Sequence, residues 1–252
     1  MKRTSVIFIM IFATVALWGQ NAGITSQISS QEGNNSRIPL IGEKAPVFTT
    51  ETTAGTFTFP YDYGDNWKIL FAHPQDFTPV CSSELLELAN LQKEFDKMGV
   101  RLFVVSTDPL KTHEQWKKAL EAIDYKGRER TKIRFPLAED LNREVSRKYG
   151  MLHASSNSTR YVRGVFIIDP ANTIRALYFY PMEVGRSTAE IVRTVAALQT
   201  VDRTAMMTPA EWLPGDDVIV PYLPSNGEAG ANKMPEGHYS LAWFMMYKKD
   251  TR

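Results

Sequence analysis

The strongest constraint on the fold is a strand–helix–strand pattern between residues 67 and 105. The apolar run WKILFA, Trp67–Ala72, has the length and composition of a buried strand. Apolar residues then recur at helical spacing over Leu85–Met98, and a second strand-like run, Val100–Val105, follows. Two strands joined through a helix pair in parallel, with a right-handed crossover. The pattern therefore predicts an α/β fold.

The chain beyond this unit adds further elements. Helical spacing predicts helices at His113–Ile123 and Asn142–Tyr149. The apolar runs Gly164–Ile168 and Thr173–Tyr180 flank the turn DPAN and predict a β-hairpin. A capping-box sequence, STAE, opens a helix expected over Ser187–Thr200. Together these elements predict a mixed central sheet with helices on both faces.

The two ends of the chain differ from this central part. Two basic residues precede the apolar run Val6–Trp18, and small and polar residues follow, which is the three-part pattern of a secretory signal peptide. An apolar run this short does not span a bilayer comfortably, so the alternative of an uncleaved anchor is disfavoured. We expect an exported protein, periplasmic or secreted, without a stable membrane anchor. The predicted parts are a signal peptide at 1–22, a flexible leader at 23–37, a main domain at 38–202 and a C-terminal extension at 203–252.

The extension is rich in proline and ends in an apolar segment, Tyr239–Tyr247. A tail of this kind has few means of building a core of its own. We expect the apolar segment to pack on the main domain or to form a dimer contact.

Charge and cysteine content exclude several classes of function. The chain has 29 basic and 28 acidic residues, so no overall field attracts nucleic acid or an anionic membrane. Cys81 is the only cysteine, which excludes an internal disulfide, an iron–sulfur cluster and a two-thiol redox motif within one chain. No metal-ligand cluster is evident among the four histidines, His73, His113, His153 and His238. His113 lacks the second helical histidine of a zinc protease motif and is expected on a solvated helix.

Cys81 is expected in the first turn of a helix. Pro79 is well placed as the first helical residue, and the residue before a proline avoids the helical region, so Thr78 is predicted as the N-cap. First-turn N–H groups lack intrahelical partners and carry the positive end of the helix dipole, which favours a thiolate. The dipole supplies only about 0.3–1 kcal/mol, so an arginine close to the sulfur is expected too. The alternative is an inert buried cysteine, the commonest role of a lone thiol.

The segment around Cys81 resembles a known active site. Pro74-x-x-x-Thr78-x-x-Cys81 is similar to the signature of the peroxiredoxins, and the flanking HP and PVCSSE, with the C-terminal extension, resemble the one-cysteine, peroxiredoxin-6 subfamily. Arg163 in YVRGVFIIDP resembles the active-site arginine of that family. The similarity covers roughly Ile41–Tyr247.

The resemblance implies a thioredoxin-like fold with a C-terminal peroxiredoxin extension, and a thiol peroxidase active in antioxidant defence and redox homeostasis. Cys81 would attack hydrogen peroxide or an organic hydroperoxide and become a sulfenic acid. Thr78 would hydrogen-bond the peroxide, Pro74 would shield the sulfenate, and Arg163 would stabilise the thiolate and the developing negative charge.

Three further residues have supporting roles in this interpretation. Glu84 matches an acidic residue that orients the arginines, and Arg186 in PMEVGRS matches a second arginine of the same network. His73 is treated as supporting only. The resemblance also implies that no cofactor, whether metal, haem or flavin, is needed, that an external thiol or dithiol reduces the enzyme, and that the protein is a homodimer or larger homo-oligomer.

Alternatives remain beside these roles. Arg163 could be a charged residue that keeps an edge strand from aggregating, and Arg186 could be a surface charge near the start of a helix. At the level of the whole protein, the rivals are a non-enzymatic thioredoxin-fold chaperone or binding protein with a vestigial cysteine, and a thiol/disulfide oxidoreductase. The missing C-x-x-C pair disfavours the second of these.

Overall fold

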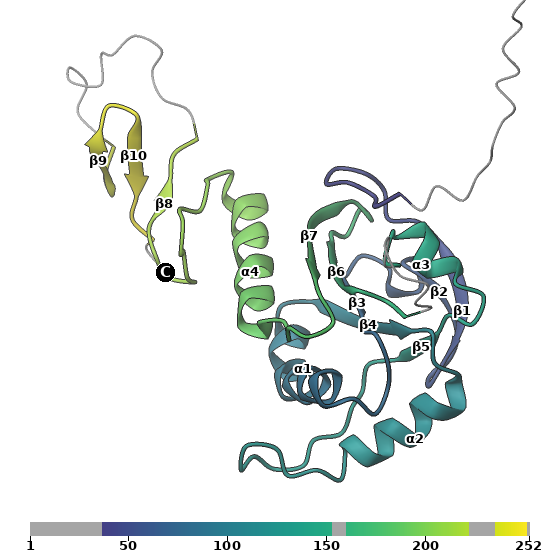
Figure 1. Ribbon diagram of the computed structural model, residues 1–252. Helices are drawn as coiled ribbons and strands as arrows, with labels where there is room; N and C mark the ends of the chain where they lie inside the picture. The colour runs from purple at the N-terminus through teal and green to yellow at the C-terminus, as the bar shows by residue number, and fades with distance from the viewer. Residues whose placement is uncertain (1–36, 153–159, 222–234, 251–252) are drawn as a thin grey trace, which may run out of the picture. The chain divides into compact units, whose positions relative to one another are not determined.

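A seven-stranded mixed sheet forms the centre of the molecule, with strands in the order β2-β1-β5-β4-β3-β6-β7 (Figure 1). The computed structural model describes residues 37–152, 160–221 and 235–250, which all belong to one unit, Ser36–Arg252. In chain order, the strands are β1 (Phe48–Thr52), β2 (Gly55–Phe59), β3 (Trp67–Ala72), β4 (Val100–Ser106), β5 (Leu137–Glu139), β6 (Arg163–Ile168) and β7 (Ile174–Tyr180). Because residues 1–36 lie outside the described ranges, the predicted signal peptide and nearly all of the leader have no structural description.

The predicted strand–helix–strand unit is confirmed. Strands β3 and β4 pair in parallel, with Trp67 opposite Val100, and helix α1 (Pro79–Lys97) connects them. Side chains of β3 alternate between two cores, Ile69 and Phe71 on one face of the sheet and Leu70 and Ala72 on the other. Because helices or other chain segments cover both faces, all six residues of β3 are buried.

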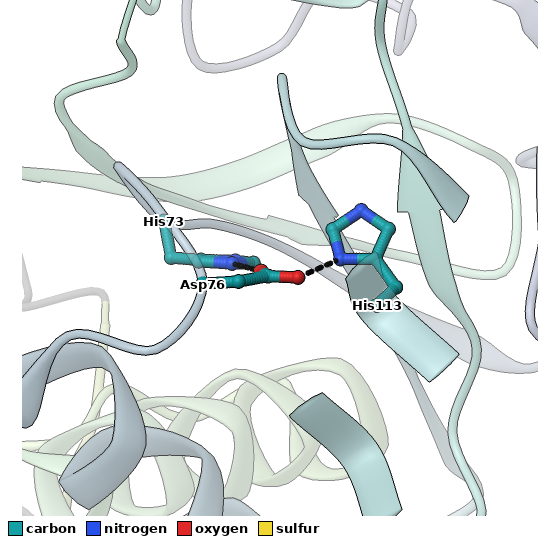
Figure 2. A group of neighbouring side chains, drawn as sticks. All are labelled: His73, Asp76 and His113. Atoms are coloured by element: carbon teal, nitrogen blue, oxygen red, sulfur yellow. Dashed lines mark hydrogen bonds and ion pairs between the residues drawn. The ribbon is translucent and has the colours of Figure 1, made fainter. Parts of the chain in front are cut away.

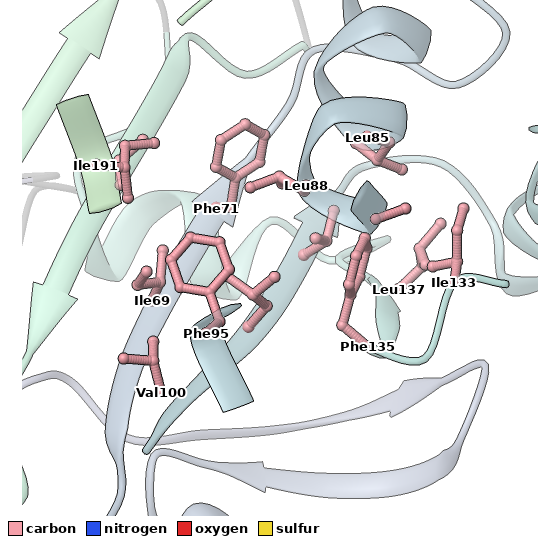
Figure 3. Close-up of a cluster of buried hydrophobic side chains, with 14 of the residues drawn as sticks. Ile69, Phe71, Leu85, Leu88, Phe95, Val100, Ile133, Phe135, Leu137 and Ile191 are labelled. Atoms are coloured by element: carbon pink, nitrogen blue, oxygen red, sulfur yellow. The ribbon is translucent and has the colours of Figure 1, made fainter. Parts of the chain in front are cut away.

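The first face packs against α1, α2 (Leu110–Leu120) and α4 (Thr188–Thr204), and Figure 3 shows part of this core. The second face is covered by aromatic side chains of β1 and β2 and by α3 (Glu144–Lys148) with the residues that follow it. The predicted mixed sheet with helices on both faces is therefore confirmed.

Helix α2 starts and ends three residues earlier than predicted, because it begins directly after Pro109. Helix α4 has the predicted N-cap, where the Ser187 hydroxyl accepts a hydrogen bond from the Glu190 backbone N–H at 3.2 Å. The Glu190 carboxylate accepts hydrogen bonds from Arg193, at 2.5 and 2.8 Å, in place of the capping-box bond to the Ser187 backbone that the sequence predicts.

The strands β1, β2 and β5 were not anticipated from the sequence. Strands β1 and β2 form a hairpin in which Thr52 pairs with Gly55. Strand β1 (FTTET) has one large apolar residue, and β2 (GTFTF) has two that alternate with threonine, so neither contains an apolar run. Strand β5 has only three residues, which is too short for a periodic signal. Strands β6 and β7 pair as the predicted antiparallel hairpin.

The C-terminal extension forms a second, three-stranded sheet in the order β8-β10-β9, from β8 (Val218–Ile219), β9 (His238–Ala242) and β10 (Met245–Lys248). The apolar segment Tyr239–Tyr247 forms a hairpin that pairs with β8, and its turn exposes the rings of Trp243 and Phe244. The buried contact with the main domain is made by Trp212 and Val218 against Ala197 of α4. The expectation that the apolar segment packs on the main domain or forms a dimer contact stays a prediction. No helix in the described part of the chain is long and apolar enough to cross a membrane.

Candidate active site

Cys81 lies in the first turn of α1 and is completely buried. Pro79 is the first helical residue and Thr78 occupies the N-cap position in an extended conformation, as the X-Pro geometry predicts. The Thr78 hydroxyl does not cap the helix, because it donates to the carbonyl oxygen of Gln75 at 3.1 Å. Its lone pairs therefore remain available as acceptors.

Arg163 contacts the cysteine sulfur directly. It is the first residue of β6, and its Nη1 lies 3.2 Å from Cys81 Sγ and 2.7 Å from Oε2 of Glu84. Its Nε and Nη2 both donate to the carbonyl oxygen of Met182, at 2.9 and 2.6 Å. The guanidinium is held on two sides, so Nη1 is fixed between the sulfur and the carboxylate.

Arg186 is locked into the same network from the segment before α4. Its Nη1 donates to the carbonyl oxygens of Ala72 and Gly164, at 2.7 and 2.8 Å. Its guanidinium carbon lies 3.3 Å from the centre of the Phe71 ring. These contacts come from the neighbouring strands β3 and β6, so Arg186 ties the arginine network to the central sheet.

The charges of this cluster do not cancel. Burial raises the pKa of the Glu84 carboxyl, but hydrogen bonds and charge from Arg186 and Arg163 outweigh it, so the pKa lies below its ordinary value and Glu84 is ionised. Two buried guanidinium groups thus share one carboxylate. One positive charge remains to be balanced by an anion at the sulfur or at an oxygen bound to it.

The structure thus brings together four of the seven residues singled out from the sequence: Cys81, Glu84, Arg163 and Arg186. The alternatives considered for the two arginines are wrong. Arg163 is 2% exposed on a strand that lies between β3 and β7, and Arg186 is 7% exposed. Neither is a surface charge. Pro74 and Thr78 lie in the loop that leads into α1.

His73 belongs to a second buried cluster, with Asp76 and His113 (Figure 2). Asp76 bridges the rings, with Oδ1 2.8 Å from His73 Nε2 and Oδ2 2.7 Å from His113 Nδ1. The expectation that His113 lies on a solvated face is wrong, because the residue is completely buried. The sequence also offered no indication that one potential ligand atom from each of these three residues lies within 4.8 Å of the other two, close enough to share a metal ion. In this structure, hydrogen bonds join His73, Asp76 and His113. His153 lies outside the described residues.

Hydrogen-bond chemistry assigns the protons of this cluster. Burial raises the pKa of Asp76, but hydrogen bonds from both histidines lower it below its ordinary value, so the group is an ionised acceptor. His113 Nε2 faces the carbonyl oxygen of Ala138 at 3.1 Å, and a carbonyl only accepts. His113 therefore carries protons on both nitrogens. Burial lowers the pKa of His73 despite Asp76, which leaves that ring neutral with a buried, unpartnered Nδ1.

Asp76 and His113 were not singled out as functional residues from the sequence. Asp76 lies inside the stretch that resembles the family signature, and this position was the available signal. His113 lies three residues before Trp116 and seven before Leu120, which is the spacing of the buried face of α2. A polar residue at core spacing could have marked it as a buried hydrogen-bonding group.

A thioredoxin-like sheet that holds a single buried cysteine at a helix N-terminus, against a fixed guanidinium, defines a thiol-dependent enzyme class. The comparisons with known proteins make this more specific. The chain belongs to the AhpC/TSA family, the peroxiredoxins, with a match over residues 41–177, and residues 197–236 match the C-terminal domain of 1-Cys peroxiredoxin. Family membership and the single cysteine fit a peroxidase.

Relatives and solved structures agree with this assignment. A peroxiredoxin of Methanosarcina mazei is 47% identical over 219 residues, covering 85% of this chain and all of the relative. The solved structure of a yeast mitochondrial 1-Cys peroxiredoxin is 36% identical, with a TM-score of 0.73 over 84% of this chain and all of the other. Peroxiredoxin 6 of Arenicola marina is 30% identical with a TM-score of 0.72, covering 84% and 98% of the two chains.

Proposed function

We propose that this chain is a one-cysteine thiol peroxidase that reduces hydrogen peroxide and organic hydroperoxides through Cys81. The observation that carries the proposal is the contact of 3.2 Å between Arg163 Nη1 and Cys81 Sγ. The contact lies in a buried cluster with an excess positive charge. A fixed cationic donor beside the sulfur suits a reaction in which a negative charge moves from sulfur to oxygen.

The proposed reaction balances without a cofactor. The Cys81 thiolate attacks one oxygen of ROOH, the O–O bond breaks, and the departing alkoxide or hydroxide takes one proton and leaves as alcohol or water. The sulfur is oxidised to a sulfenic acid and the peroxide is reduced. Because Cys81 is completely buried, the peroxide reaches the sulfur only when neighbouring side chains move.

Residues of the loop before α1 have proposed roles in positioning. The hydroxyl of Thr78 donates to Gln75, so it can accept a hydrogen bond from the protonated oxygen of the peroxide. Pro74 is proposed to shield the sulfenate, which its buried position supports. His73 is proposed to support the loop through its bond to Asp76.

An external thiol completes the proposed cycle. Cys81 is the only cysteine of the chain, so a thiol from outside must condense with the sulfenic acid, releasing water, and a second thiol must reduce the mixed disulfide. For the yeast mitochondrial relative, the reported thiol-resolving mechanism involves glutathione and thioredoxin systems. A small thiol or a dithiol protein is therefore the proposed reductant class.

The proposal is tested by mass spectrometry of the protein after one equivalent of peroxide in the presence of a sulfenic-acid trap. We expect one trap adduct, on Cys81, and loss of peroxide consumption in Cys81→Ser with an unchanged circular dichroism spectrum. A wild-type protein without adduct or peroxide consumption would instead support the non-enzymatic chaperone or binding protein. Turnover of a disulfide substrate without peroxide would support the oxidoreductase.

Export and self-association are further proposals. The basic residues before the apolar run Val6–Trp18 support export, and the mass of the mature N-terminus in an extracytoplasmic fraction tests it. The exposed turn of the C-terminal hairpin, with Leu241, Trp243 and Phe244 all more than half exposed, supports a homodimer or larger homo-oligomer. Sedimentation velocity of the wild type and of Trp243→Ser tests that proposal, because loss of the ring should shift the equilibrium toward monomer.

A further inference from the structure

A strongly basic segment joins α2 to β5. Its exposed side chains alternate with buried ones, so Arg130, Lys132 and Arg134 face solvent while Ile133 and Phe135 enter the core, as Figure 3 shows for the last two. Because side chains of an extended chain alternate in direction, the three cations lie on one side of the segment.

These cations line a hollow of about 330 Å³ between the segment and α1. Lys93 of α1 adds a fourth positive charge, and Glu129 is the only acidic residue among those that line it. The chain as a whole is almost neutral, so this surface concentrates charge that a net count does not reveal.

The cations of the hollow are only partly neutralised by neighbouring carboxylates. Lys132 pairs with Glu121 and Arg134 with Asp96, each at 2.8 Å. Arg101 also binds Asp96, so that one carboxylate serves two arginines. Within the described ranges, Lys93 and Arg130 form no ion pair or side-chain hydrogen bond.

A buried glutamine, Gln92, holds the backbone of the basic segment in place. Gln92 of α1 donates through Nε2 to the carbonyl oxygen of Lys132 at 2.8 Å, and its Oε1 accepts from the backbone N–H of Arg134 at 2.6 Å. The basic segment is thereby tied to the helix at Lys132 and Arg134, two residues apart. The hollow is preformed, which lowers the entropy lost when a ligand binds.

We propose that this hollow binds a compact, multiply charged oxyanion, with phosphate or carboxylate groups. Lys93 and Arg130 are the principal contacts, because their donors are uncommitted, and Arg134 adds the donors that Asp96 does not use. Arginine and lysine donors recognise such oxygens through charge-assisted hydrogen bonds. The mutual repulsion of four cations around a hollow is relieved when an anion enters it.

This site is separate from the peroxide site. Cys81 lies in the first turn of α1 and Lys93 twelve residues further along the same helix, a rise of about 18 Å at 1.5 Å per residue. The proposal therefore stands or fails independently of the peroxidase activity.

Isothermal titration calorimetry with pyrophosphate, at constant ionic strength, tests the proposal on the full chain. We expect one binding event per chain, and an affinity reduced at least about tenfold in the double variant Lys93→Gln/Arg130→Gln, because two charge-assisted bonds are lost. Glu129→Gln should bind more tightly, since the one carboxylate of the hollow is gone.

Lys118→Gln is the matched control, because Lys118 is an exposed cation on α2 outside the hollow. Its affinity should equal that of the wild type. An equal loss in the control and the double variant would overturn the site in favour of diffuse charge attraction, and so would absence of binding to the wild type. Circular dichroism and peroxide consumption of each variant separate loss of the site from loss of the fold.

Discussion

Glu84 and Arg186 are joined by three hydrogen bonds, from the backbone N–H and Nε of the arginine to Oε1 and from its Nη2 to Oε2, at 2.7–2.8 Å. This arrangement fixes the plane of the carboxylate. The remaining bond, from Arg163 to Oε2, then fixes the guanidinium that touches Cys81. The orientation of the Arg163 donor at the sulfur thus depends on Arg186, which acts through Glu84 and not through a hydrogen bond to the sulfur.

Glu84→Gln should destabilise the protein by about 3 kcal/mol, because two buried guanidinium groups lose their counter-charge. Glu87→Gln is the matched control, since Glu87 lies one turn further along α1 and pairs with Lys126 and Arg128 at the surface. It should cost less than about 1 kcal/mol. Urea unfolding measures both, and equal effects of the two variants would contradict the role given to Glu84.

The contribution of Glu84 should depend on pH. Its folded-state pKa lies below the ordinary value of 4.5. A lowered carboxyl pKa gives stability that is fully present above the unfolded-state pKa and is lost as pH falls through the folded-state pKa. The difference in unfolding free energy between wild type and Glu84→Gln should therefore be constant above about pH 5.5 and shrink toward pH 3. If the difference in unfolding free energy grows on acidification, the folded-state pKa of Glu84 is raised and not lowered.

Arg163→Lys keeps the charge but cannot bridge the sulfur, Glu84 and the Met182 carbonyl with one planar group. We expect the second-order rate constant for peroxide reduction to fall about 100-fold, the effect of removing one positioned donor. Stopped-flow fluorescence or competition kinetics measures it. Arg175→Lys, on the neighbouring strand β7, should stay within about twofold, because Arg175 pairs with Asp202 near the surface. A similar loss in both variants would remove the special role of Arg163.

The sequence predicts the elements that have strong local signals. The buried strand Trp67–Ala72, the β6–β7 hairpin and the N-cap of α4 are each specified by residues within a few positions of one another. The order of strands in the sheet is not specified by such local signals. Strand β5 lies between β1 and β4 because it pairs with residues far away in the chain. Short strands such as β5 form because neighbouring backbones offer hydrogen bonds, which leaves little trace in local composition.

The candidate site divides in the same way. The position of Cys81 in the first helical turn follows from Thr78 and Pro79. An arginine near the sulfur was expected because the helix dipole alone is weak, but the choice of Arg163 and Arg186 came only from resemblance to a family, since no local pattern links residues 79 to 105 positions apart. The link between His73 and His113 was missed because it depends on the packing of α2 against the loop before α1, which a single sequence does not encode locally.

Thr78→Val separates two roles of one hydroxyl. Because the hydroxyl does not cap α1 and bonds only the Gln75 carbonyl in the structure, we expect a loss of about 1 kcal/mol in unfolding free energy. If it also binds the peroxide, the rate constant should fall about 10- to 100-fold, whereas Thr78→Ser should stay close to wild type. Peroxide kinetics and urea unfolding on the same samples test this. A rate unchanged in Thr78→Val would remove the hydroxyl from the reaction.

Asp76→Asn tests the charge assignment in the second buried cluster. The substitution keeps the shape of the side chain but leaves His113 either as an uncompensated buried cation or, if it loses a proton, with fewer donors for its two acceptors. We expect a loss of about 3 kcal/mol, against less than about 0.5 kcal/mol for the exposed Asp124→Asn. Nitrogen-15 NMR of the imidazole rings should show His113 protonated on both nitrogens in the wild type and His73 on one. A neutral His113 in the wild type, or an Asp76→Asn protein as stable as the control, would contradict the assignment.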